Sequence, residues 1–189
     1  ILNTYPVSRM RNQLILAREV EMRSNFGAFS AALESAAVLD YETAATALSI
    51  LDIGREQRVL VTDAGGRVVY DNLKTSDLIG KTALFSEIIE ALSGKDVFRC
   101  TYDAQAFNYR TACTIIRDNA VVGAVYAYQY DSSSADLLQE TREEILQISD
   151  EVTIMRDGQY IGTWDAKDLT TDLIIEKEVG RELKNLYPP

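Results

Sequence analysis

Histidine is absent from this chain of 189 residues, and cysteine occurs only at Cys100 and Cys113. Without histidine the chain can form neither a Ser-His-Asp triad nor a Cys-His nucleophile pair. The common His-ligated metal sites are excluded as well, and two cysteines are too few for a Cys-rich zinc site. These absences remove most catalytic and metal-binding classes that a sequence can reveal. We therefore expect no metal, no cofactor and no catalytic residues.

Positive charge and long apolar runs are also scarce. Lys and Arg number 19 against 29 Asp and Glu, which gives a net charge of −10. Nucleic-acid binding needs a basic patch, so we expect no nucleic-acid partner. No apolar run approaches the ~20 residues that span a bilayer, and no signal peptide is visible. Because the chain begins with Ile1, we expect any membrane spans of a parent protein to lie outside it.

Residues 8–53 have the character of a long helix, rich in alanine, with Asp40 placed to cap a second helix that starts at Tyr41. Five apolar residues in this region follow the a and d spacing of a coiled-coil seam. They are Ile15, Met22, Phe26, Phe29 and Leu33. This seam either packs on the chain's own domain or forms a dimer interface. The two interpretations are compatible, and we expect a homodimer.

The middle of the chain predicts a five-stranded sheet. Gly65-Gly66 is a favoured hairpin turn between the first two strands, and Asp118-Asn119 is a turn between the last two. A short helix at 84–92 separates the second and third strands, and the polar run from Asp131 caps a helix that ends near residue 148. The strands are expected at 58–64, 67–71, 97–102, 109–117 and 120–130. Hairpins dominate, so the sheet is mostly antiparallel and the fold class is α+β.

Four segments in the middle of the chain form a pattern of strands, turns and a short helix: VLVTDAGGRVVYDN at 59–72, DLIGK at 77–81, SEIIEALSGK at 86–95 and RDNAVVGAVYAYQYDSS at 117–133. On these segments, residues 58–131 resemble the extracytoplasmic sensor domain of a bacterial membrane histidine kinase, of the PAS-like or single-Cache type. In that family one helix leaves the membrane and another returns to it, and residues 8–53 and 134–148 match those helices. The resemblance covers about residues 5–149. It implies a ligand-sensing domain on the extracytoplasmic face of the cell membrane that signals by helix displacement to a two-component kinase.

The tail resembles a different family. A predicted hairpin, with strands at 152–155 and 159–164, is followed by a helix that Thr170 or Thr171 caps. The sequences ISDEVTIMRDGQYIGT at 148–163 and VGREL at 179–183 resemble the ATP-binding subunit of a sugar-import ABC transporter, over residues 144–189. Such subunits are cytoplasmic, so we interpret the chain as a fusion. Its expected parts are a helical region at 1–55, a sensor core at 56–149 and the tail at 150–189.

The alternative function is a fragment of a sugar ABC transporter ATP-binding subunit fused to a regulatory domain. Gly80-Lys81-Thr82 mimics the end of a P-loop, but that loop needs a glycine five positions before Gly80, where Thr75 stands. The ABC signature Leu-Ser-Gly-Gly-Gln is absent as well. The segment therefore predicts an ordinary loop, and we expect no ATPase or kinase activity from this chain.

Aromatic and basic residues gather on the predicted sheet. Tyrosines alternate along the last strand, so they share one face, and arginines lie on the neighbouring strands. In PAS-like and Cache folds a sheet face forms the ligand pocket, and an arginine beside tyrosines can bind a carboxylate through two hydrogen bonds. The candidate ligand-binding residues are Arg99, Tyr102, Arg110, Tyr126 and Tyr128. The alternative is an ordinary solvated face.

The two cysteines lie on consecutive predicted strands, at Cys100 and Cys113. If the two residues oppose each other, they could form a cross-strand disulfide in an oxidising compartment. The alternative is a pair of small buried thiols.

Overall fold

The computed structural model describes residues 5–50, 57–73, 77–103, 105–156, 158–170, 173–174 and 176–177. These residues belong to two compact units, one of residues 15–134 and one that combines residues before 15 with residues after 134. The division into 1–55, 56–149 and 150–189 by origin and role stays a prediction. Among the described residues, no helix is both long and apolar enough to cross a membrane.

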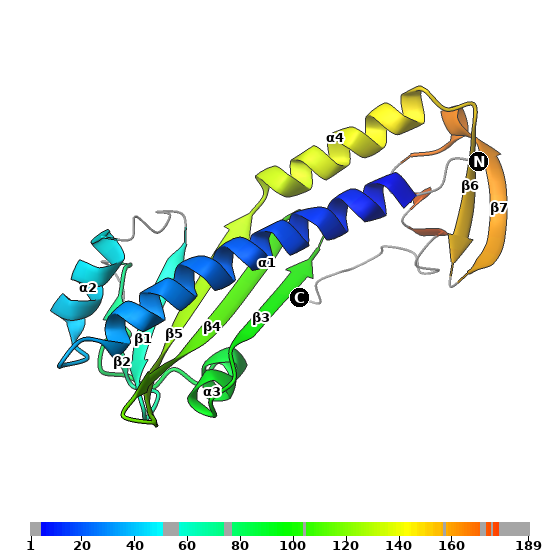
Figure 1. Cartoon of the computed structure of the whole chain (residues 1–189). Coiled ribbons are helices and arrows are strands. Elements are labelled where there is room, and N and C mark those ends of the chain that lie inside the picture. Colours follow the sequence, from blue (N-terminus) through cyan, green and yellow to red (C-terminus); the bar gives the residue numbers. More distant parts are fainter. Residues whose placement is uncertain are drawn as a thin grey trace. The chain divides into compact units, whose positions relative to one another are not determined.

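The larger unit contains the predicted five-stranded antiparallel sheet, in the order β2-β1-β5-β4-β3 (Figure 1). Its strands are β1 (Arg58–Asp63), β2 (Val68–Asp71), β3 (Val97–Tyr102), β4 (Phe107–Arg117) and β5 (Ala120–Asp131). The sheet and the long helix that precedes it confirm the α+β fold class. Gly123 on β5 shows how closely the central strands approach, because a Cβ there would lie 2.1 Å from the carbonyl oxygen of Thr62 on β1.

Helix α1 spans Tyr5–Glu34, and its part from residue 15 onward runs across one face of the sheet (Figure 1). Four of the five predicted seam residues, Met22, Phe26, Phe29 and Leu33, have no solvent exposure within the single chain. They therefore pack inside the protomer and are not available as a dimer surface. Ile15 is half-buried. For these four residues the structure shows the first interpretation of the seam, a helix packed on its own domain. Dimerisation stays a prediction.

A second helix, α2 (Tyr41–Ile50), follows α1 after a break, as Asp40 predicted. The Asp40 carboxylate accepts a hydrogen bond from the backbone N–H of Thr43 at 2.9 Å, which is the capping contact expected at a helix start. The region 8–53 thus contains two helices, as predicted, and residues 51–53 lie outside the described residues. Arg117 on β4 fixes the end of α1, because its guanidinium donates hydrogen bonds to the carbonyl oxygens of Leu33, Glu34 and Ala37.

Helix α3 (Ser86–Leu92) packs on the opposite face of the sheet. Ile88 and Ala91 of α3 belong to one buried apolar cluster with Leu60, Ala112 and Tyr126 from three strands. The side chains of α1 and α3 thus cover different faces, because neighbouring residues along a strand point to opposite sides. We refer to these as the α1 face and the α3 face.

Helix α4 (Ser133–Gln147) leads into the tail. There β6 (Glu151–Arg156) and β7 (Gln159–Asp165) form the predicted hairpin, followed by the short 3-10 helix η1 (Ala166–Asp168). The hairpin has a small core of its own, built from Val152, Ile154, Ala166, Leu169 and Ile174. The Thr170 hydroxyl accepts a hydrogen bond from the backbone N–H of Leu173 at 3.3 Å, as expected for a helix cap.

Candidate functional site

A row of polar side chains crosses four strands of the sheet on the α3 face. Arg99 on β3 pairs with Arg110 on β4, Arg110 pairs with Tyr128 on β5, and Tyr128 pairs with Arg58 on β1. Residues in direct register share a face of the sheet, so these four side chains lie side by side. Tyr126 is two residues before Tyr128 and faces the same way. Four of the five predicted ligand-binding residues are therefore brought together.

Tyr102 does not join them, because the structure places it on the α1 face. It pairs with Phe107 across β3 and β4, and the two rings stack with centroids 4.6 Å apart. Tyr102 is three residues from Arg99 on the same strand, and an odd spacing puts two side chains on opposite faces. Tyr102 is part of an aromatic stack under α1, apart from the arginine–tyrosine row.

The Glu87 carboxylate of α3 lies close to the guanidinium groups of Arg99 and Arg110. Its residue exposure is 3%, and its Oε1 lies 3.3 Å from Nη1 of Arg99 and 4.0 Å from Nη1 of Arg110. The Ser86 hydroxyl donates to its Oε2 at 3.1 Å. Burial alone would raise the pKa of Glu87, but hydrogen bonds from its own backbone N–H, from Ser86 and from Arg99 outweigh burial and lower the pKa. Glu87 is thus a charged, nearly buried carboxylate.

Arg99 is held by more acceptors than Arg110. Its guanidinium also forms an ion pair with Glu90 and donates to the Ser86 hydroxyl at 2.7 Å. Arg110 meets Glu87 only at the 4.0 Å limit of an ion pair, and its side chain is 40% exposed. Of the two arginines, Arg110 is therefore the better placed to receive a further acceptor.

Aromatic side chains flank the arginines. The Phe85 ring stacks on the Tyr126 ring with centroids 5.1 Å apart, and the Tyr128 hydroxyl donates to the Asn108 side chain at 2.8 Å. Burial, followed by the nearby Glu87 carboxylate, raises the pKa of Tyr126 to about 12, so its hydroxyl stays protonated at neutral pH. Phe85 is 44% exposed, so its ring is accessible from solvent beside the polar row.

Sequence reasoning missed three members of this site, Arg58, Phe85 and Glu87. Arg58 carries a signal in the sequence, since it starts a strand whose alternate residues point to the α3 face. It forms an ion pair with Asp71 at 2.8 Å. Phe85 and Glu87 come from the segment that enters α3, and no strand pattern predicts where a helix directs its side chains.

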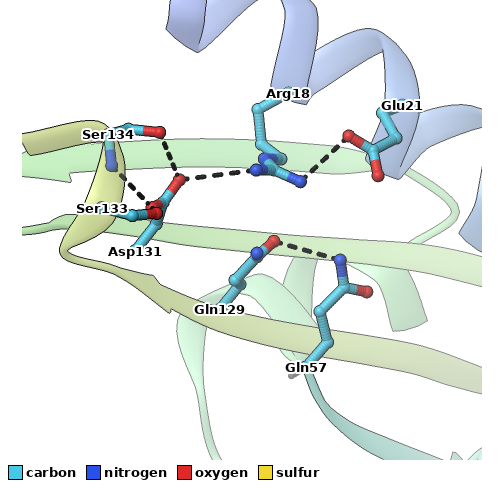
Figure 2. Close-up of polar contacts among 7 residues, drawn as sticks. All are labelled: Arg18, Glu21, Gln57, Gln129, Asp131, Ser133 and Ser134. Carbon is cyan, nitrogen blue, oxygen red and sulfur yellow. Dashed lines mark hydrogen bonds and ion pairs between the residues drawn. The ribbon is translucent and has the colours of Figure 1, made fainter. Parts of the chain in front are cut away.

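The α1 face carries a second polar cluster, which joins helices to the sheet (Figure 2). The Asp131 carboxylate at the end of β5 accepts hydrogen bonds from the backbone N–H of Ser134 at 3.0 Å and from the hydroxyls of Ser133 and Ser134. Arg18 of α1 lies 3.4 Å away and pairs with the same carboxylate. Nearby, the buried Gln57 amide donates to Gln129 at 3.0 Å. Asp131 thus connects α1, β5 and the first turn of α4.

The cysteines form no disulfide with each other. Cys100 pairs across β3 and β4 with Tyr109, while Cys113 lies beyond the Val97–Ala112 pair at the other end of the ladder. The two residues therefore do not oppose each other. Cys113 is the small buried thiol of the alternative interpretation, at 3% exposure, whereas Cys100 is half-buried. Burial raises the pKa of Cys113 to about 12.

The P-loop-like segment is a loop, as expected. Gly80 adopts a positive φ of 81°, and Lys81 forms an ion pair with Asp77 at 2.6 Å. The described residues contain no group of three or more His, Cys, Asp or Glu side chains that could hold a metal ion.

The tail and the fold of this chain are similar to different known proteins. No family model matches it. A C-terminal stretch of 47 residues, 25% of the chain, is 74% identical to the galactose/methyl galactoside import ATP-binding protein MglA of Clostridium tetani. The xylose import ATP-binding protein XylG of Photobacterium profundum is 58% identical over 45 residues. The tail is thus similar to sugar-import ATP-binding proteins, as predicted, but the chain spans only 9% of the length of either relative.

The fold as a whole is shared with a solved extracellular ligand binding receptor from Desulfohalobium retbaense. The TM-score is 0.56 at 15% sequence identity, over 94% of this chain and 32% of the receptor. The sensor domain of the Vibrio cholerae histidine kinase DctB aligns at a TM-score of 0.45 and 11% identity, over 98% of this chain and 80% of that one. The first of these likenesses confirms the predicted fold.

Proposed function

We propose that residues 15–134 form a non-catalytic sensing domain that binds a small carboxylate on the α3 face. The observation that carries the proposal is the row of Arg99, Arg110 and Tyr128 across three strands. A guanidinium presents two parallel N–H donors that match a carboxylate, and aromatic rings beside it exclude water from the ion pair. The fold shared with an extracellular ligand binding receptor supports the same function.

Arg110 is the primary anchor in this proposal. Its guanidinium, on a side chain that is 40% exposed, meets Glu87 only at 4.0 Å, so its N–H groups can donate to a ligand oxygen without first losing a short ion pair. Tyr126 and Tyr128 on the next strand, with the exposed ring of Phe85, would form the walls around the ligand. Arg99 would contribute a second positive charge.

The signal would leave through the helices. Asp131 links Arg18 of α1 to the first turn of α4, so a shift of β5 on ligand binding would act on both helices at one point (Figure 2). We propose that the domain faces the outside of a bacterial cell, that it forms a homodimer, and that it controls a two-component histidine kinase by helix displacement. A ligand can drive such a shift only through different affinity for two states.

A second candidate concerns the tail alone. Its 74% identity to a sugar-import ATP-binding protein favours an origin in that family. The P-loop glycines and the signature motif on which nucleotide hydrolysis depends are absent from the sequence. The tail would then contribute a folded hairpin to the chain and no ATPase activity.

Thermal unfolding of the full chain in the presence of mono-, di- and tricarboxylates tests the proposal. A ligand that binds the folded state raises the melting temperature, and Arg110→Ala should abolish the rise. Arg23→Ala is the matched control, because Arg23 lies on α1, away from the α3 face, and pairs with Glu19 at 2.8 Å. Undiminished carboxylate binding by the Arg110→Ala variant, or no binding by the unmodified chain, would refute the proposed site.

A further inference from the structure

Glu87 lies where a bound carboxylate would be expected. One of its oxygens, Oε1, faces Nη1 of Arg99 at 3.3 Å and Nη1 of Arg110 at 4.0 Å, so a single carboxylate spans both guanidiniums. We infer that Glu87 is a tethered carboxylate that occupies the ligand position, and that a ligand binds by replacing Glu87 at the two arginines. The inference rests on the proposed function of the α3 face, and it adds the residue that sets the affinity of that face.

The charges of the face favour replacement over simple addition. The α3 face carries three positive and three negative side chains, joined by ion pairs. They are Arg58, Arg99 and Arg110, and Asp71, Glu87 and Glu90. An added anion would enter a face whose positive charges are already matched, next to the buried carboxylate of Glu87. Two carboxylates within a few ångströms repel each other strongly at low dielectric. An anionic ligand that takes the place of Glu87 avoids that repulsion.

The start of α3 is built so that Glu87 can leave. Phe85, the residue before the helix, makes no side-chain capping hydrogen bond. Leu84 and Ile89 on either side of Glu87 are 75% and 53% exposed, so the outer surface of this turn is open to solvent. A released Glu87 carboxylate regains its hydration, which offsets part of the ion pairing that it loses. Ile88 and Ala91 would keep the rest of α3 on the sheet, since both are fully buried.

Replacement makes the apparent affinity depend on Glu87. A ligand that can bind only when Glu87 has moved away has its affinity reduced by the fraction of molecules in that state. Ligand binding would also free the first turn of α3. The same exchange would therefore set a threshold concentration and change the structure of the domain.

Chemical rescue tests the inference without knowledge of the natural ligand. Glu87→Ala leaves the two arginines and opens the space of one carboxylate, and free acetate is the probe. Hydrogen exchange of globally protected β4 and β5 amides is measured by mass spectrometry in the full chain, with sodium acetate against sodium chloride at equal ionic strength. Acetate at ten times its dissociation constant should slow this exchange about tenfold in Glu87→Ala, because acetate binds the folded chain and not the unfolded chain. The unmodified chain should respond equally to both salts.

Glu90→Ala is the matched control. Glu90 lies on the same helix and pairs with the same Arg99, but its side chain is 42% exposed, so water fills the space that it leaves. Glu87→Asp keeps a carboxylate and should not respond to acetate. If Glu87→Ala does not fold, Glu87→Gln fills the same volume without the charge and should bind succinate about tenfold more tightly than the unmodified chain.

The outcomes separate this inference from the proposed function. An equal acetate response in Glu87→Ala and Glu90→Ala, or equal succinate affinity in Glu87→Gln and the unmodified chain, overturns the role of Glu87. Arg110-dependent carboxylate binding by the unmodified chain would leave the sensing function standing in that case. Acetate rescue of Glu87→Ala supports the tethered carboxylate. If the unmodified chain then binds no carboxylate of the panel, the sensing function and the replacement of Glu87 by a ligand are both refuted, and only the contact of Glu87 with the two arginines stands.

Discussion

Replacing Asp131 with alanine should destabilise the larger unit more than any single surface change. Asp131 is 6% exposed and accepts hydrogen bonds from the first turn of α4, from two hydroxyls and from Arg18. Loss of a helix cap costs about 1 kcal/mol. Removal of this nearly buried, charged acceptor also leaves its donors unpaired, which costs about 1.5–3 kcal/mol more. We expect a total loss of about 2.5–4 kcal/mol in the free energy of unfolding, from the sum of these two contributions.

Asp131→Asn separates the cap from the charge. Asparagine caps helices about as well as aspartate, so this variant should retain the cap and lose only the charge-assisted part. A double-mutant cycle with Arg18→Ala then measures the Arg18–Asp131 coupling, which we expect at about 0.5–1.5 kcal/mol for a partly buried ion pair at 3.4 Å. The free energies should rank the unmodified chain first, Asp131→Asn second and Asp131→Ala third.

The assay must report on the sheet itself. Trp164, the only tryptophan, lies on β7 in the tail, so tryptophan fluorescence follows the wrong unit. Hydrogen exchange of β4 and β5 amides is a direct measure, and a loss of about 2.5–4 kcal/mol corresponds to exchange roughly 70- to 800-fold faster for globally protected amides. A loss below about 0.5 kcal/mol in Asp131→Ala would show that the cluster is an ordinary surface contact, and would refute the reasoning.

The pH dependence follows from the same carboxylate. Burial alone would raise the pKa of Asp131, but hydrogen bonds from Ser134 and Ser133, with Arg18 nearby, outweigh burial and lower the pKa below its ordinary value. A lowered folded-state pKa gives stability that is present above the unfolded value of about 3.9 and is lost as the pH falls through the folded value. Asp131→Asn should therefore flatten the acid limb of the stability profile below about pH 4. An unchanged acid limb would contradict this contribution.

Two further predictions test the packing of the sheet. Gly123→Ala should lower the free energy of unfolding by about 1–3 kcal/mol, because the new Cβ would lie 2.1 Å from the Thr62 carbonyl oxygen and the central strands would have to separate. A melting temperature within 1 °C of that of the unmodified chain corresponds to a loss of at most about 0.3 kcal/mol and would contradict this close approach. Cys113 should resist alkylation in the folded chain at pH 8, because burial raises its pKa to about 12, while Cys100 should react. Peptide mapping after iodoacetamide treatment checks this, and rapid labelling of Cys113 in the native state would show that the α1 face opens.

The apolar repeat of α1 illustrates what the sequence can and cannot predict. The spacing of Met22, Phe26, Phe29 and Leu33 correctly predicted a helix with one apolar side. An amphipathic helix looks the same whether its apolar side meets a second helix or a sheet, so the pattern left the partner open. The sheet meets α1 with buried residues of β4 and β5, which include the apolar side chains of Phe107, Tyr109, Val125 and Ala127. Only the tertiary structure shows this pairing.

The candidate site was predictable wherever strand alternation applies. Tyr126 and Tyr128 are two residues apart, and they share a face as predicted. The same rule, applied to the odd spacing of Arg99 and Tyr102, is enough to exclude Tyr102 from the row. Glu87 is different, because it reaches the arginines from a helix whose rotation over the sheet depends on the buried contacts of Ile88 and Ala91. No local pattern encodes that rotation.

The two similarities of this chain differ in kind, because the tail shares sequence with its relatives and the receptor shares only the fold. The tail keeps 74% identity over 47 residues, enough to specify a hairpin with its own core, but the chain lacks the phosphate-binding residues of an ATPase. The receptor shares the fold over 94% of this chain at 15% identity, and this likeness concerns the fold alone. Neither similarity names a ligand. The proposed sensing function therefore depends on what the α3 face can bind, and the test of that proposal is whether an external carboxylate can displace Glu87 from Arg99 and Arg110.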